Sequence, residues 1–199
     1  GIHDSGGGVE RGLRERAASL RAEGRRAVLL RPVLARHGEG ERGEAGERRY
    51  RPGLCVVGDG GEGGYPNLRF RLPEELDALA RLLRADRPAS LEVHHLLGHD
   101  HAVVELAARL GIPTDYHVHD YAAFCPRITL VGAGGRYCGE PEAAAVCDAC
   151  VADGGPAIEE EIGVAALRAR SARDFAAARR IVTPSQDTAA WLRRHFPAI

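Results

Sequence analysis

The chain has 199 residues, of which 44% are apolar, enough for one globular domain with a packed core. Its 27 basic and 28 acidic side chains leave a net charge of -1, so it lacks the positive footprint of proteins that bind nucleic acid or an anionic surface. No apolar run approaches the roughly 20 residues of a membrane span, and no signal peptide is recognisable, so we expect a cytoplasmic protein.

The first part of the chain alternates helical patterns with short apolar runs. A helix is predicted over 9–23, followed by a strand over 27–33. Residues 35–53 are nearly all Arg, Glu and Gly, which predicts a solvated loop or a frayed hairpin. Two further strands are predicted over 54–57 and 68–72. The face of the first helix is defined by apolar or small residues at helical spacing: Val9, Leu13, Ala17 and Leu20.

The same alternation continues through the middle of the chain. Leucines at helical spacing predict a helix over 74–85, and apolar runs predict strands over 91–97 and 116–119 on either side of a helix over 102–110. Strands that alternate with helices are typical of an α/β domain with a parallel sheet and helices on both faces. We therefore predict a single α/β domain over residues 1–199.

The last part of the chain begins with a Cys-rich loop over 121–155, which has no obvious secondary structure and is therefore expected to be functional. A long helix over 158–180, a short strand over 181–183 and a final helix over 186–195 follow. A parallel sheet of this kind normally begins with a strand before its first Gly-rich turn, yet only two residues precede that turn. We expect a truncated first strand, or a substitute edge strand near Leu54.

A Gly-rich turn leads into the first helix. Gly6, Gly7 and Gly8 leave the backbone N–H groups of the helix start open to a phosphate or a sugar hydroxyl. Glu10, one turn further, is a candidate acceptor for a ligand. The alternative is that Asp4 or Ser5 caps the helix and Glu10 complements its dipole.

Histidines gather at the ends of two predicted strands, where ligands bind in open α/β sheets. His117 and His119 share one strand face, a geometry also found in metal-dependent hydrolases. We single out His119 because Asp120 and the Cys-rich loop follow it. The alternative is a hydrogen-bonded strand end. The earlier cluster comprises His94, His95, His99, Asp100 and His101.

Four cysteines in the loop form a candidate metal site: Cys125, Cys138, Cys147 and Cys150. Four thiolates suit a closed, structural zinc site, and the last two have zinc-knuckle spacing. Two disulfides, free thiols or an iron–sulfur cluster are the alternatives. Cys55, in an apolar run, is expected to be an ordinary buried cysteine. Arg127 is a candidate phosphate ligand, or a cap for a backbone carbonyl.

Three segments resemble the N-terminal domain of bacterial family 4 glycosyltransferases, which have the GT-B fold of two facing Rossmann-like domains. They are GGGVERGLRERAASLRAEG, VHDYAAFCPR and IVTPSQDTAAWLRRHFP. The resemblance implies that Gly6, Gly7 and Gly8 line the cleft near the diphosphate and the acceptor, and that His119 contacts the transferred sugar. Glu10, Asp120 and Arg127 complete the expected substrate-binding residues.

The resemblance also implies what the intact enzyme does. It would move a sugar, with retained configuration and without a catalytic metal, from a nucleotide-sugar to a glycan or lipid-linked acceptor in cell-surface polysaccharide synthesis. The C-terminal domain that binds the nucleotide-sugar is absent from this chain, so we expect an acceptor-side half that is inactive alone and that touches the inner face of the membrane peripherally. A metal-dependent hydrolase and a non-enzymatic, zinc-stabilised binding module remain the alternatives.

Overall fold

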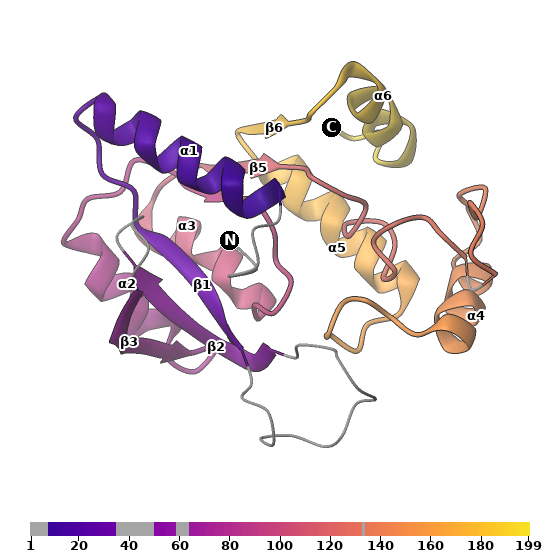
Figure 1. Ribbon diagram of the computed structural model, residues 1–199, viewed down its shortest axis with the longest axis horizontal. Helices are drawn as coiled ribbons and strands as arrows, with labels where there is room; N and C mark the ends of the chain where they lie inside the picture. Colours follow the sequence, from indigo (N-terminus) through magenta and orange to yellow (C-terminus); the bar gives the residue numbers. More distant parts are fainter. Residues whose placement is uncertain (1–7, 35–49, 59–63, 133) are drawn as a thin grey trace. The chain divides into compact units, whose positions relative to one another are not determined.

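The computed structural model describes residues 8–34, 50–58, 64–132 and 134–199 (Figure 1). The chain divides into two compact units, Gly1–Pro113 and Thr114–Ile199. Each unit combines helices with strands, which confirms the predicted mixed α/β class.

The sheet of the first unit differs from the prediction. Its strands β1 (Leu29–Leu34), β2 (Tyr50–Gly58) and β3 (Gly64–Arg71) form an antiparallel sheet in that order. A parallel arrangement was wrong for these strands because a parallel crossover needs a dozen or more residues, usually helical. Only residues 59–63 separate β2 from β3, and residues 35–49 carry no apolar helical pattern.

The segment around Leu54 lies in the middle strand of this sheet, so it is not the substitute edge strand of a parallel sheet. Its neighbour Gly53 has φ +66°, and a Cβ at that position would overlap the carbonyl oxygen of Leu72. The Gly53 carbonyl in turn accepts the Leu72 N–H at 2.7 Å. The backbone therefore requires glycine at this position, for both its conformation and its size.

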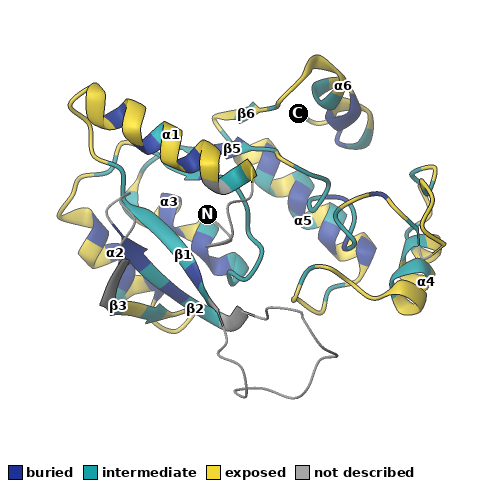
Figure 2. Cartoon of the chain, viewed as in Figure 1, coloured by how far each residue is buried: buried dark blue, intermediate teal, exposed yellow. Residues whose placement is uncertain are grey.

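The helices of the first unit have buried and exposed sides (Figure 2), and α2 (Leu76–Arg84) lies where the leucine periodicity predicted a helix. The helix α2, the 3₁₀ helix η1 (His101–Glu105) and α3 (Leu106–Leu110) share a buried apolar cluster with β2. The helix α1 (Gly8–Ala22) buries its predicted apolar face. The shared cluster comprises Cys55, Val57, Leu72, Leu76, Leu79, Ala80, Leu83, Ala102, Val103 and Leu106.

The strand β4 (Leu91–Val93) is shorter than the predicted 91–97. Its first N–H donates to the Pro113 carbonyl at 3.0 Å, and the chain then turns through the histidine-rich segment. Asp100 accepts the Ala102 N–H at 2.8 Å as the N-cap of η1. Asp100 therefore has a structural role, as the residue that caps the start of η1.

The second unit pairs β5 (Thr114–His117) with β6 (Arg180–Val182) in parallel, with Tyr116 opposite Ile181. Its helices are α4 (Ala144–Gly154), α5 (Val164–Ala177) and α6 (Gln186–His195). The Cys-rich loop thus contains an unpredicted helix. The helix predicted from residue 158 begins at Val164, whose N–H donates to Asp148 of α4 at 2.9 Å.

Aromatic rings make up about half of the buried core of the second unit, beside aliphatic side chains such as Val164 and Leu192. Tyr116 packs edge-on against Phe175, Phe175 against Phe196, and Phe124 against Trp191, with centroid separations of 5.1 to 5.4 Å. These contacts connect β5, α5, α6 and the start of the Cys-rich loop. The loop is therefore fixed at its first turn by core packing.

Candidate functional site

The chain leaves β5 in a tight turn that exposes His119. The Val118 N–H still donates to the β6 carbonyl of Val182 at 2.9 Å, but the strand itself ends at His117. Asp120 then accepts the Ala122 N–H at 2.8 Å. This side-chain to backbone hydrogen bond fixes the turn. His119 accordingly lies after the strand, not within it as predicted, and its side chain is exposed.

Arg127 connects distant parts of the Cys-rich loop by hydrogen bonds. Its guanidinium donates to the backbone carbonyls of Val131 at 3.0 Å and Gly155 at 2.9 Å. Gly155 lies just after α4, so one side chain connects the two ends of the loop. The geometry matches the carbonyl-capping alternative for Arg127, and its role toward a phosphate stays a prediction.

The four cysteines of the loop are all partly buried, and none forms a disulfide. Burial raises the pKa of the Cys147 thiol, and the neighbouring Cys125 and Cys138 thiols raise it further. Within the described part of the chain, no three cysteine sulfurs lie within 4.8 Å of one another. Cys55 is buried in the first unit, as predicted, and burial raises its pKa to about 11.

Arg168 of α5 donates hydrogen bonds to several groups of the Cys-rich loop. Its N–H groups donate to the carbonyls of Phe124, Pro141 and Glu142 at 2.9 to 3.3 Å and to the Cys147 sulfur at 3.1 Å. The guanidinium carbon also lies 3.6 Å from the centroid of the Phe124 ring. A cation beside Cys147 favours the thiolate, which is the form that binds metals.

Glu140 fastens the loop to α6. Its carboxylate accepts hydrogen bonds from Trp191 at 2.6 Å, His195 at 2.6 Å and Arg194 at 3.2 Å, and from the Tyr137 hydroxyl. Burial alone would raise the pKa of Glu140, but these hydrogen bonds outweigh it and hold the pKa below its usual value. The φ of +53° at Glu140 is uncommon for a residue with a side chain. The anchor therefore holds a strained backbone in place.

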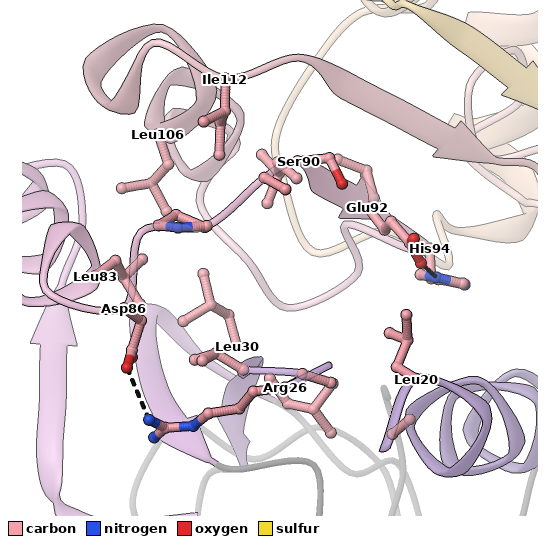
Figure 3. Close-up of a pocket in the computed structure, with 18 of the residues that line it drawn as sticks. Leu20, Arg26, Leu30, Leu83, Asp86, Ser90, Glu92, His94, Leu106 and Ile112 are labelled. Carbon is pink, nitrogen blue, oxygen red and sulfur yellow. Dashed lines mark hydrogen bonds and ion pairs between the residues drawn. The ribbon is translucent and has the colours of Figure 1, made fainter. Parts of the chain in front are cut away.

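A second polar cluster lies in the first unit, at the carboxyl end of β4. Glu92 accepts from Arg16 of α1 at 2.8 and 3.3 Å, and the His94 Nε2 lies 3.5 Å from the same carboxylate. These side chains border a cavity of about 420 Å³ whose other walls are mainly aliphatic (Figure 3). At its far end, Arg26 and Asp86 form an ion pair at 2.7 Å.

Two more histidines line this cavity. The His95 Nδ1 accepts the Leu97 N–H at 3.0 Å, so a neutral ring carries its proton on Nε2. Burial lowers the pKa of His99 to about 4, and its Nδ1 has no hydrogen-bond partner among the described residues. His99 is thus a neutral, half-buried imidazole at pH 7.

The predicted residues fall into three groups. Gly6 and Gly7 lie outside the described residues, while Gly8 opens α1; Glu10 lies in its first turn, and its side chain is also outside the described part. His119, Asp120, Arg127 and the four cysteines lie together in the second unit, around one loop. Four charged residues with side-chain contacts were not predicted as site residues: Arg16, Glu92, Glu140 and Arg168. Of these, only Glu92 gave a signal, a charge within an apolar strand pattern.

No protein-family model, curated protein or solved structure matches this chain. Among the described residues, no helix has both the length and the apolar character needed to cross a bilayer.

Proposed function

We propose that this chain is the acceptor-side half of a retaining glycosyltransferase, with a Rossmann-like GT-B half as its fold. The intact enzyme would transfer a sugar from a nucleotide-sugar to a glycan or lipid-linked acceptor. The proposal rests on the three resembling segments, of which one includes His119 and Asp120 and another forms β6 and α6.

One observation carries the proposal: an exposed imidazole directly follows the carboxyl end of a parallel strand. In open α/β sheets, that edge is where ligands bind. A structural histidine would be expected to pack its ring into the core, whereas His119 is exposed beside a turn that Asp120 fixes. The Asp120 hydrogen bond to Ala122 gives this carboxylate a positioning role.

The chemistry expected of His119 is binding and orientation. An imidazole presents one donor and one acceptor when neutral, and so can contact a sugar hydroxyl in either sense. Holding the sugar in the reactive orientation lowers the barrier by removing freedom before the reaction. The charge that develops on the leaving diphosphate would be stabilised by groups of the intact enzyme.

The test is sugar transfer by the natural gene product, assayed with uridine- and guanosine-diphosphate hexoses. We expect His119→Ala to lower kcat by about 100-fold, through lost orientation of the sugar, with an unchanged midpoint of chemical unfolding. Arg136→Ala, an exposed change in the same loop, is the control and should leave kcat unchanged. Hydrolysis of these donors without a transfer product, or unfolding of the His119 variant, would contradict the proposal.

We also propose that the four loop cysteines hold a structural zinc ion. The donor set fits this metal: four thiols, none in a disulfide, with the Arg168 cation hydrogen-bonded to Cys147. Four thiolates complete a tetrahedral shell, so the ion would be structural and not catalytic. The loop would close further around the metal, since zinc-bound sulfurs lie closer together than the free thiols do here.

Metal analysis of protein purified without added zinc tests this second proposal. We expect about one equivalent of zinc per chain, and loss of that zinc in a Cys147→Ser, Cys150→Ser double variant. Cys55→Ala is the matched control, because Cys55 lies in the other unit, and should retain the metal. Zinc well below one equivalent in the unaltered protein would overturn the proposal.

A further inference from the structure

The cavity of the first unit has an exposed end and a more buried end. The exposed end is lined by four charged, solvent-exposed residues: Arg25, Arg26, Asp86 and Arg87. At the other end lie Glu92 and His94, whose side chains are only 18% and 11% exposed. Figure 3 shows the Arg26–Asp86 ion pair and the Glu92–His94 group on opposite sides of the space. The Arg-rich end is therefore the entrance of the cavity, and the Glu92 end is its floor.

Aliphatic side chains line the space between the entrance and the floor. They come from four elements and surround the space in Figure 3: Leu20 of α1, Leu30 of β1, Leu83 of α2 and Leu106 of α3. An occupant must therefore be apolar over most of its length. The volume of about 420 Å³ lies toward the small end of the range for small-molecule sites, which favours a short chain over a long or branched lipid.

The charges at the entrance do not cancel. The Arg26 guanidinium is paired with Asp86 at 2.7 Å, and the Arg25 guanidinium lies 3.8 Å from the Glu23 carboxylate. The Arg87 side chain has no ion-pair or hydrogen-bond partner among the described residues. Three arginines against two carboxylates leave one positive charge at the entrance.

The backbone at Arg87 is unusual. Its φ of +46° is uncommon for a residue with a side chain, and Pro88 follows directly. The Arg87 N–H donates to the Arg84 carbonyl at the end of α2, at 3.1 Å. Strained backbone of this kind is concentrated at binding and catalytic sites. The strain thus supports a ligand at the entrance.

We propose that this cavity binds a medium-chain fatty acid, with the carboxylate at Arg87 and the hydrocarbon chain along the leucines. The chain would have about eight to twelve carbons, to match the size of the pocket. The inference is independent of the proposed sugar transfer. Every described residue that lines the cavity belongs to the first unit, whereas His119 belongs to the second.

The head group follows from the charge at the entrance. A guanidinium can donate two parallel hydrogen bonds to a carboxylate, and a carboxylate supplies the single negative charge that the entrance lacks. A phosphate monoester carries about 1.5 to 2 negative charges at pH 7, which is more than the entrance balances. A neutral or cationic head group would leave the Arg87 charge without a partner.

The floor limits the length of the chain. The Glu92 carboxylate accepts a hydrogen bond from Arg16 at 2.8 Å and lies 3.5 Å from the His94 Nε2. A hydrocarbon end pressed against these groups would remove water from them without replacing its hydrogen bonds. The chain therefore ends before it reaches the floor.

Isothermal titration calorimetry of the 199-residue chain with hexanoate, octanoate and decanoate tests the proposal, at concentrations too low for micelles. Each methylene that enters the cavity should tighten binding about fourfold. Octanol, which lacks the charge, should bind about tenfold more weakly than octanoate.

A variant of the entrance tests the position of the head group. Arg87→Asn removes the charge with a residue type that tolerates positive φ. It should weaken octanoate binding about tenfold and leave octanol binding unchanged. Arg81→Gln, an exposed change on α2 outside the cavity, is the matched control and should alter neither.

Each outcome decides the matter. Tighter binding along the acid series, with the loss confined to Arg87→Asn, supports the fatty-acid site. Equal binding of octanol and octanoate would show apolar filling alone, and would overturn it. Absence of binding by all three acids, or equal weakening by Arg87→Asn and Arg81→Gln, would overturn it as well.

A second variant tests the position of the hydrocarbon chain. Ala17 is 1% exposed and lines the cavity from α1, so Ala17→Phe fills part of the space. We expect this variant to lose binding of decanoate while its circular dichroism spectrum is retained. A folded variant with undiminished affinity would place the fatty acid elsewhere, and would overturn the proposal.

Discussion

The two units are stabilised by different kinds of contact. The buried cluster of the first unit is aliphatic apart from Cys55, and it is spread over β2, α2, η1, α3 and Leu72, the residue after β3. In the second unit, aromatic rings share the core with aliphatic side chains, and the Cys-rich loop depends on Arg127, Glu140 and Arg168. A loop with few large aliphatic residues thus keeps its shape through a small number of polar atoms. We therefore expect that many apolar contacts share the stabilisation of the first unit, whereas a few polar side chains stabilise the Cys-rich loop of the second.

The largest effect is expected in the aliphatic core. Leu79 of α2 is completely buried, so Leu79→Ala should lower the free energy of unfolding by about 3 kcal/mol, through lost burial and a residual cavity. Urea denaturation followed by circular dichroism measures this. Leu82→Ala on the exposed side of the same helix is the control. Similar losses for both variants would break the picture of a buried α2 face.

Glu140→Gln tests the polar contacts that fasten the Cys-rich loop to α6. The amide keeps the size of the side chain but loses the charge, so some of the donors from Tyr137, Trp191, Arg194 and His195 lose their acceptor. We expect a loss of about 2 kcal/mol and faster cleavage of the loop in limited proteolysis. The exposed Glu142→Gln is the control, since Arg168 uses only the backbone carbonyl there.

The pH dependence of stability tests the effect of one polar side chain, His99, in the mainly aliphatic first unit. Its folded pKa of about 4 lies below the usual value of 6.5, so the unfolded state binds the proton first. The stabilising contribution is complete above about pH 6.5 and is lost as the pH falls toward 4. Between pH 7 and 5 we expect a loss of about 1 to 2 kcal/mol, measured by urea titration at each pH. His99→Gln should remove this part of the pH dependence; an unchanged slope would contradict it.

The smallest effect is expected at an exposed ion pair. Arg11 and Glu15 lie one turn apart on the solvent side of α1, with 82% and 66% of their side chains exposed. Water and salt screen such pairs. Arg11→Gln should leave the unfolding midpoint within experimental error. A measurably lower unfolding midpoint would mean that surface charge contributes to the stability of the first unit, and would contradict the contrast between the two units.

The sequence predicted the elements of this fold better than their arrangement. Helical spacing located α1, α2 and α6, because each buries one apolar face. The direction of the strands was harder to predict, because an antiparallel and a parallel strand show the same apolar run when both are partly buried. α4 escaped notice because its Ala- and Cys-rich sequence has no buried residue and hence no periodic face.

The candidate site was only partly predictable for a related reason. His119 and the cysteines belong to residue types that carry chemistry, and they are close together in the sequence. The partners that fix the loop are remote: Trp191 and His195 lie more than 50 residues from Glu140. Arg168 looks like any other arginine of a helical segment. Such pairings follow from tertiary packing, which a single sequence does not disclose.

Gly53 has a consequence for how this protein can vary. Any side chain there meets the Leu72 carbonyl, and the positive φ disfavours every other residue. A library of all twenty amino acids at this codon, selected for folded protein, should return glycine alone. At Gly24, where φ is also positive but the surroundings are open, asparagine should be recovered as well. Steric exclusion and conformational preference would thereby be told apart within one chain.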